Sequence, residues 1–139
     1  MVPLSFGWRH PLFANWPVHS DVVAARVPDA LDVEAYDGSA WLSVVPVLSV
    51  DTRPRGLQVM PEFPLSEVHL RTYVARDGEP GVYFFSLDAQ GVLGVLGARV
   101  FHHLPYFYAR ISLDVAGDRV RFESTRRHPG ARPYRFTGS

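Results

Sequence analysis

The chain has 139 residues, of which 47% are hydrophobic and 13% aromatic, and its 14 basic and 14 acidic residues leave a formal charge of zero. This length and composition predict one folded domain with a real core and exclude a disordered chain. A neutral chain without a long basic run argues against a nucleic-acid partner. No apolar run is long enough to cross a membrane and the first residues do not resemble a signal peptide, so we expect a cytoplasmic protein with no membrane partner.

Two residue types are absent. Without cysteine the chain has neither a disulfide framework nor a thiol nucleophile. All 14 basic residues are arginine, and a guanidinium cannot lose the proton that Schiff-base chemistry requires near neutral pH. Within these residues imine chemistry would fall to the α-amino terminus alone. We therefore expect no lysine-dependent decarboxylase and no cofactor, and leave open whether the protein is an enzyme.

The first 30 residues predict an edge segment followed by a helix. Residues 8–18 are aromatic and contain Pro11 and Pro17, which cannot donate in a strand ladder, so they read as an extended edge segment. Ser20 is placed to cap a short helix over residues 21–27.

The next segment predicts two strands and a long loop. Residues 31–35 alternate in polarity, and residues 40–50 form the clearest apolar strand of the first half. Pro46 inside that strand argues for an edge position or a bulge. Residues 51–66 contain several prolines and no periodicity, which predicts a loop that covers a pocket or mediates contacts.

Residues 67–76 and 82–87 predict a hairpin whose loop is Asp77–Pro80. With four loop residues Arg76 faces Gly81, and a three-residue loop would reverse the faces of the second strand. The predicted polar face contains Glu67, His69, Arg71, Tyr73, Phe84, Ser86 and Asp88. The opposite face, predicted to be core, contains Val68, Leu70, Thr72, Val74, Tyr83, Phe85 and Leu87.

The second half predicts a helix and two more strands. A helix beginning near Asp88 carries glycines at 91, 94 and 97, whose spacing favours close packing on the sheet over a dinucleotide fingerprint. Residues 106–115 alternate as a strand, and residues 119–125 return antiparallel. The fold class is mainly β (α+β), an antiparallel sheet curled into a barrel or cone, with two short helices.

Several segments together carry a family resemblance. EVHLRTYV at 67–74, DGEPGVYFFSLDA at 77–89 and LGARVFHHLPYFYARI at 96–111, with FANWPV and RPRG earlier, resemble the YqjF-like family of uncharacterised bacterial proteins. That family is similar to acetoacetate decarboxylase, so the resemblance implies a cone-shaped antiparallel barrel with a central pocket. The decarboxylase works through a lysine Schiff base that has no counterpart in this sequence, so its activity is not implied.

The resemblance also bears on domain organisation. Family members usually continue well past the point where this chain stops. We therefore expect residues 1–139 to form a single acetoacetate decarboxylase-like domain that is the N-terminal part of a longer family domain, incomplete at its C-terminus.

Arg71 is the candidate anion-binding residue. Glu67 lies roughly 13 Å from it along the strand, too far to pair with it directly. Arg71 can clamp a ligand carboxylate, or it can pair with Asp88 inside the barrel, and the sequence leaves both open. Glu67 and Asp88 are the candidate acid or base. The residues expected to contact a ligand are Glu67, Arg71, Tyr73, Ser86, Asp88, His102 and Tyr106.

The histidines do not predict a metal site. His102 and His103 are adjacent, so at a helix end they point about 100° apart and do not chelate one ion easily. A site joining His69 to one of them with a carboxylate is the weaker interpretation, and a capping role at the helix C-terminus is the stronger.

Two function classes follow. The first is a barrel that binds a small anionic metabolite bearing an oxo or carboxylate group, with catalysis left open. The second is a non-catalytic module that binds a partner or assembles with itself. We expect a homo-oligomer in either case.

Overall fold

The structure is a computed structural model that describes residues 4–54, 65–91 and 104–138. Within these ranges nine strands form one sheet in the order β1-β4-β5-β6-β7-β8-β9, with β2 paired to β4 and β3 paired to β5. No helix in these ranges is long and apolar enough to span a membrane. The elements are β1 Leu4–Arg9, β2 Ala14–Val18, α1 Ser20–Ala24, β3 Asp32–Val33, β4 Ala40–Pro54, β5 Leu65–Arg76, β6 Glu79–Ala89, β7 Tyr106–Ala116, β8 Arg119–Arg126 and β9 Arg135–Gly138.

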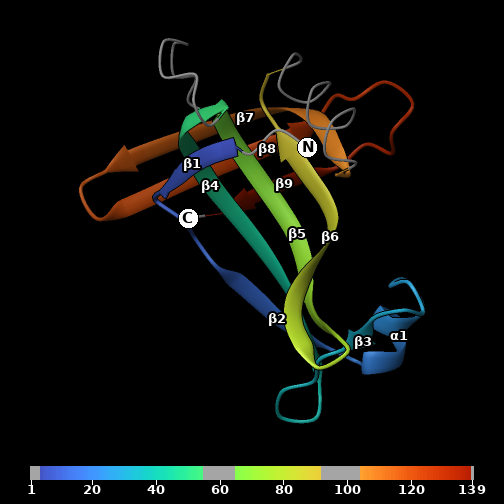
Figure 1. Ribbon diagram of the computed structural model, residues 1–139. Helices are drawn as coiled ribbons and strands as arrows, with labels where there is room; N and C mark the ends of the chain where they lie inside the picture. The colour runs from blue at the N-terminus through green and yellow to red at the C-terminus, as the bar shows by residue number, and fades with distance from the viewer. Residues whose placement is uncertain (1–3, 55–64, 92–103, 139) are drawn as a thin grey trace.

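The sheet is strongly curled (Figure 1). The long strands β4, β5 and β6 curve down to the β5–β6 hairpin, where α1 and β3 lie, while β7, β8 and β9 cross behind their upper half. All strand pairs are antiparallel except β6 with β7, where Leu87 lies beside Tyr106 and Ala89 beside Tyr108. The predicted fold class, a mainly antiparallel curled sheet with little helix, is confirmed.

The β5–β6 hairpin turns over two residues. Asp77 and Gly78 have φ angles of 51° and 80°, and Arg76 pairs directly with Glu79. Positive φ at both central residues matches the twist of the flanking strands, as in a type I′ turn. The predicted four-residue loop is therefore wrong, because Glu79 and Pro80 already belong to β6.

A bulge in β6 then reverses the faces of its second half. Arg71 pairs with Phe84 but Leu70 pairs with Ser86, so one extra residue, Phe85, is inserted. Beyond the bulge Asp88 pairs with Val68. An inserted residue moves every later side chain to the other face of the sheet. Ser86 and Asp88 therefore lie on the face away from Glu67 and His69. Leu87 lies on the same face as Glu67 and His69. The prediction that all these polar residues share one face is wrong for Ser86 and Asp88.

We call the face of β4–β6 that carries Glu67, His69, Arg71 and Tyr73 the polar face, and the opposite one the core face. On the core face β7 and β8 add their apolar residues, as the alternation of residues 106–115 predicted. The main core cluster contains Val44, Val68, Ala109, Ile111 and Phe122. A second cluster, closer to the hairpin, packs Val23 and Val27 of the α1 region against Val74.

Pro46 occupies a gap in the ladder. β4 is an inner strand, so the expected edge position is wrong for the strand as a whole. However, β1 pairs only from Leu48 onward and β2 only up to Val44, and between them Leu12 N donates to Pro46 O at 3.1 Å. The N–H and C=O of one residue point to the same side of a strand, so the missing N–H of proline faces this gap and not β5.

Three further expectations are corrected or lie outside the described residues. Helix α1 begins at Ser20 with His19 as its N-cap and no side-chain cap bond, so Ser20 is inside the helix. The expected loop at 51–66 is shorter, because β4 runs to Pro54 and β5 starts at Leu65. Most of the predicted second helix falls in residues 92–103, outside the described ranges.

Candidate functional site

Glu67 is the centre of a buried hydrogen-bonded cluster on the polar face. Its side chain is only 6% exposed. Oε2 accepts from Ser49 Oγ at 2.7 Å and lies 3.3 Å from His69 Nε2, and Oε1 accepts from the Tyr106 hydroxyl at 2.9 Å. Three strands therefore supply donors to one carboxylate: β4, β5 and β7.

These donors determine the charge of the carboxylate. Burial alone would raise the pKa of Glu67, but the hydrogen bonds from His69, Ser49 and Tyr106 outweigh it and leave the pKa below its usual value. Burial and the neighbouring carboxylate raise the pKa of Tyr106. Glu67 is thus an anion at neutral pH and Tyr106 a neutral donor.

The same network fixes the tautomer of His69. A carboxylate has no hydrogen to donate, so the hydrogen of the contact with Glu67 belongs to Nε2. In the neutral imidazole this leaves Nδ1 as an acceptor. His69 is 3% exposed, and its ring lies 5.5 Å edge-on from both Trp8 and Phe84. Its Nδ1 is buried and has no hydrogen-bond partner in the part of the chain that the structure describes.

Arg71 follows two residues later on the same face. Its guanidinium carbon lies 5.6 Å from the Phe13 ring centroid and 6.0 Å from that of Tyr73. Its Nε is buried and finds no hydrogen-bond acceptor within the described ranges. In the described ranges no carboxylate comes within ion-pair distance of Arg71. Aromatic faces attract the cation but do not satisfy its N–H groups.

Tyr73 closes the row of polar side chains on β5. Its hydroxyl lies 3.0 Å from Ser43 Oγ, and Ser43 in turn donates to the side chain of Asn15. Ser43 is fully buried. This chain of bonds joins β5 to β4 and to β2, so the Tyr73 ring beside Arg71 is held in place.

Asp88 belongs to a separate cluster on the core face. Arg126 donates to it from NH2 at 2.6 Å and from Nε at 3.0 Å, and the guanidinium lies 4.2 Å from the Phe107 ring and 5.4 Å from Tyr134. Burial raises the pKa of Asp88, while the hydrogen bonds and charge of Arg126 oppose the rise. Burial and the charge of Asp88 raise the pKa of Tyr134. The alternative that Arg71 pairs with Asp88 is therefore wrong.

The structure thus brings together only part of the predicted set. Glu67 and Tyr106 touch, and Arg71 lies beside Tyr73. Ser86 and Asp88 lie on the core face, and His102 is outside the described residues. Several residues of these clusters are absent from the predicted set. Ser49 and Ser43 could have been found from the alternation of β4, whereas Phe13 and Arg126 join these clusters only through tertiary packing.

Comparison with known proteins identifies relatives of unknown activity. Residues 5–139 match the family DUF2071, described as an uncharacterized conserved protein. The chain is 47% identical over 124 residues to "Uncharacterized protein YqjF" of Bacillus subtilis (strain 168), a match that covers 87% of this chain and 50% of the relative.

Solved structures show the same fold at low identity. Acetoacetate decarboxylase of Legionella pneumophila superposes with a TM-score of 0.68 at 16% identity, covering 93% of this chain and 46% of the other. The enduracididine biosynthesis enzyme MppR complexed with pyruvate gives 0.66 at 14% identity, covering 96% and 55%. The chain therefore spans about half the length of the proteins it matches.

Proposed function

The chain belongs to the DUF2071 family, and on the polar face of its sheet we propose a binding site for a small carboxylate-bearing metabolite. Arg71 is the anion anchor, and the Tyr73 and Phe13 rings hold its guanidinium. Ser86 and Asp88 are not part of this site, because the bulge turns them to the core face.

One observation carries the proposal. Two buried nitrogens on the same face of β5, Nδ1 of His69 and Nε of Arg71, have no hydrogen-bond partner among the residues that the structure describes. Their residues are two apart, so they lie roughly 7 Å from each other along the strand. Leaving a buried polar group unpaired costs about 1–3 kcal/mol, and a ligand that bridges this spacing removes both penalties.

The chemistry of the two nitrogens defines the ligand. Arg71 donates, so it selects a carboxylate. Nδ1 of neutral His69 accepts, so it selects a hydroxyl, such as that of a 2-hydroxy acid or of an enolised 2-oxo acid. The pyruvate complex of MppR, a protein with the same fold, supports pyruvate as a first probe.

Any chemistry on the ligand falls to His69. Both oxygens of Glu67 already accept hydrogen bonds, so Glu67 acts by orienting His69 and by stabilising its protonated form. His69 Nδ1 has unused capacity to take a proton. Since the chain contains no lysine, the proposal includes no imine formed on these residues.

Calorimetric titration with lactate, pyruvate and propionate tests the site. We expect lactate and pyruvate to bind. Propionate, which has the carboxylate but no oxygen on C2, should bind about tenfold more weakly. Arg71→Gln should weaken lactate binding by about 10- to 100-fold, while Arg110→Gln, at an exposed position on β7, should not. Equal binding by the Arg71→Gln variant, or no binding by the wild type, would overturn the proposal.

A self-associating module is the second candidate. The observation in its favour is the exposure of aromatic side chains near one edge of the sheet: Trp8 is 39% exposed, Phe13 53% and Trp16 45%. Sedimentation equilibrium tests it, since a concentration-dependent oligomer that Trp16→Ser disrupts would support assembly.

We also propose that this sheet is the N-terminal part of a longer acetoacetate decarboxylase-like domain and that the protein is cytoplasmic.

A further inference from the structure

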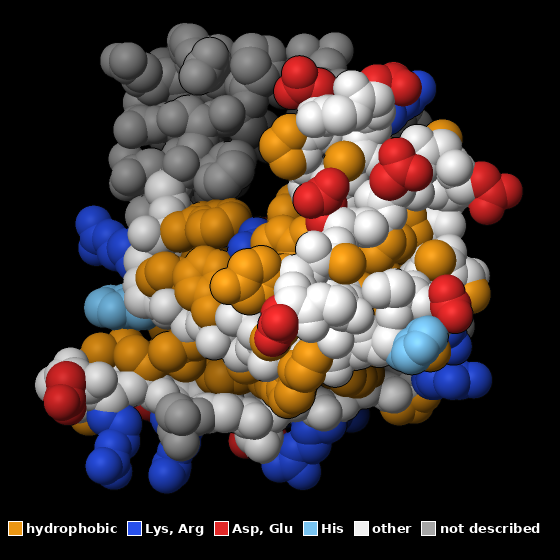
Figure 2. Space-filling view, turned by 90° about the horizontal axis from the view of Figure 1, so that it is seen from below, with side chains coloured by type: hydrophobic (Ala, Val, Ile, Leu, Met, Phe, Trp, Pro, Cys, Tyr) orange, Lys and Arg blue, Asp and Glu red, His pale blue; other side chains and the backbone are white. Residues whose placement is uncertain are grey.

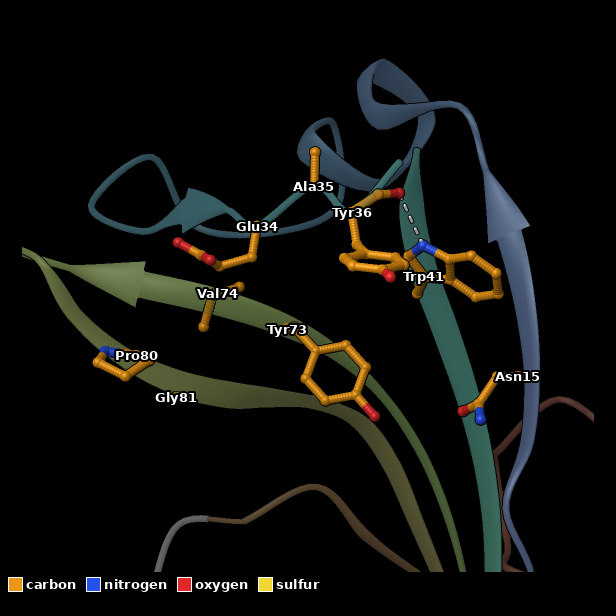
Figure 3. A pocket seen from close by; sticks show the side chains of 9 residues that line it. All are labelled: Asn15, Glu34, Ala35, Tyr36, Trp41, Tyr73, Val74, Pro80 and Gly81. Carbon is orange, nitrogen blue, oxygen red and sulfur yellow. Dashed lines mark hydrogen bonds between the residues drawn. The ribbon is translucent and has the colours of Figure 1, made fainter. Parts of the chain in front are cut away.

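A pocket lies at the hairpin end of the sheet, apart from the cluster around Glu67. It encloses about 480 Å³, which is within the usual range of small-molecule sites. Figure 3 shows Tyr36 and Trp41 on one side of the space and Tyr73 on the other, with Asn15 and Glu34 at opposite ends. Nothing in the proposed function uses this space.

The lining combines aromatic rings with a single charge. Three of the residues around the pocket are aromatic, and Glu34 is the one charged residue among those that line it in the described part of the chain. Figure 2, which views the molecule from this end, shows hydrophobic side chains over the middle of the face with several acidic side chains among and beside them. Rings that expose their negative faces and a nearby carboxylate both favour a positive ligand.

The aromatic wall is fixed before any ligand arrives. Asp37 and Gly38, with φ angles of 53° and 75°, form a tight turn that Tyr36 and Ser39 close with two backbone hydrogen bonds of 2.9 and 3.2 Å. Trp41 Nε1 donates to Tyr36 O at 3.0 Å. These bonds fix the Tyr36 backbone, while its ring, 76% exposed, remains available to a ligand.

We propose that this pocket binds a small organic cation of the alkylammonium or quaternary ammonium class, held by the rings of Tyr36, Trp41 and Tyr73 and by the charge of Glu34. A quaternary ammonium has no N–H to satisfy, which suits an aromatic wall with few acceptors. The ligand has the opposite charge from the one proposed for Arg71, and the two sites share only Tyr73. The inference therefore stands or fails independently of the proposed function.

Choline and its neutral isostere 3,3-dimethyl-1-butanol separate the charge from the shape of the ligand. In calorimetric titration of the full chain, choline should bind saturably and about tenfold or more tightly than the alcohol. Equal affinities would show a merely apolar pocket and overturn the proposal. Absence of choline binding up to tens of millimolar would overturn it as well.

Variants locate the binding. Tyr36→Ala should weaken choline binding about tenfold, and Tyr36→Phe, which keeps the ring, should retain it. Glu34→Gln should weaken it a few-fold and reduce its dependence on salt, whereas Asp114→Asn, at an exposed acid on β7, should change neither. Unchanged binding in Tyr36→Ala would place the cation elsewhere and contradict the proposal. Lactate binding, measured in parallel, should be the same in Tyr36→Ala and wild type.

Discussion

The hydroxyl of Tyr106 and the carboxylate of Glu67 form a hydrogen bond of 2.9 Å between residues 39 positions apart. Their strands, β7 and β5, are not neighbours, because β6 lies between them. The bond therefore crosses over β6 and connects the two parts of the curled sheet above Leu87, which pairs with both Tyr106 and His69. The bond also stabilises the ionised form of Glu67, the carboxylate that orients His69.

Tyr106→Phe should destabilise the fold. The change removes one donor to a buried anion at nearly constant volume, which is expected to lower the free energy of unfolding by about 1.5–3 kcal/mol. Urea unfolding monitored by circular dichroism gives the value. Tyr83→Phe is the control, because no hydrogen bond to the Tyr83 hydroxyl is found in the described ranges, and it should change stability by less than about 0.5 kcal/mol. Equal effects of the two changes would contradict this role of Tyr106.

Stability should fall in acid through Glu67. Its folded-state pKa lies below its unfolded value, so its contribution is present above about pH 4.5 and is lost as the pH falls through the folded pKa. Asp88 acts in the opposite direction. Burial raises its pKa in the folded state, so the folded protein binds this proton at a higher pH than the unfolded chain does. Glu67→Gln should therefore make the decline between about pH 5 and pH 3 shallower than in the wild type. Urea unfolding at stepped pH measures both slopes, and identical slopes would show that Glu67 does not carry the dependence.

Asp88→Ala should be among the most damaging single changes. It leaves the guanidinium of Arg126, only 13% exposed, without its acceptor, and breaking a buried pair in this way costs about 3–5 kcal/mol. The double change Asp88→Leu with Arg126→Met should recover most of that loss, because it removes both charges.

A surface ion pair supplies the matched control for Asp88. Glu123 and Arg135 form a 2.7 Å contact with side chains 46% and 67% exposed. Glu123→Ala should lower the free energy of unfolding by less than about 1 kcal/mol. If Asp88→Ala were equally mild by urea unfolding, the pair on the core face would not stabilise the junction of β6 and β7.

Gly78→Ala should destabilise the hairpin through the backbone alone. Gly78 has a φ of +80°, and an added Cβ would meet no atom within 4 Å. The expected loss is about 1 kcal/mol, the cost of a left-handed conformation for alanine. Gly81→Ala is the control, because that position is equally open and lacks the positive φ. Thermal unfolding should rank Gly78→Ala below Gly81→Ala, and the reverse order would contradict the turn geometry.

The sequence predicted the sheet better than the site. Alternation predicted the strand over residues 106–115, and a strand over residues 67–76 put Glu67, His69 and Arg71 on one face, as found. The bulge at Phe85 could not be read from the sequence, because an inserted residue leaves no mark in a strand where both faces carry aromatic residues. This single insertion moved Asp88 to the core face, away from Arg71.

Other contacts depend on packing between distant segments. Arg126 lies in an arginine-rich stretch of the sequence, yet it turns inward to Asp88, 38 residues earlier. Phe13 lies in a segment with no regular period, and its contact with Arg71 depends on the pairing of the adjoining strand β2 with β4. Local patterns carry no information about such pairs.

The Nε–H group of Arg71 offers the most direct test of the proposed site. In the ¹H–¹⁵N spectrum of the arginine side chains, Arg71→Gln identifies its resonance by its disappearance. Saturating lactate should shift that resonance and protect it from exchange with water, while the resonance of Arg110 stays in place. Lactate binding with an unmoved Arg71 resonance, or the same spectrum with and without lactate, would contradict an anion site on the polar face.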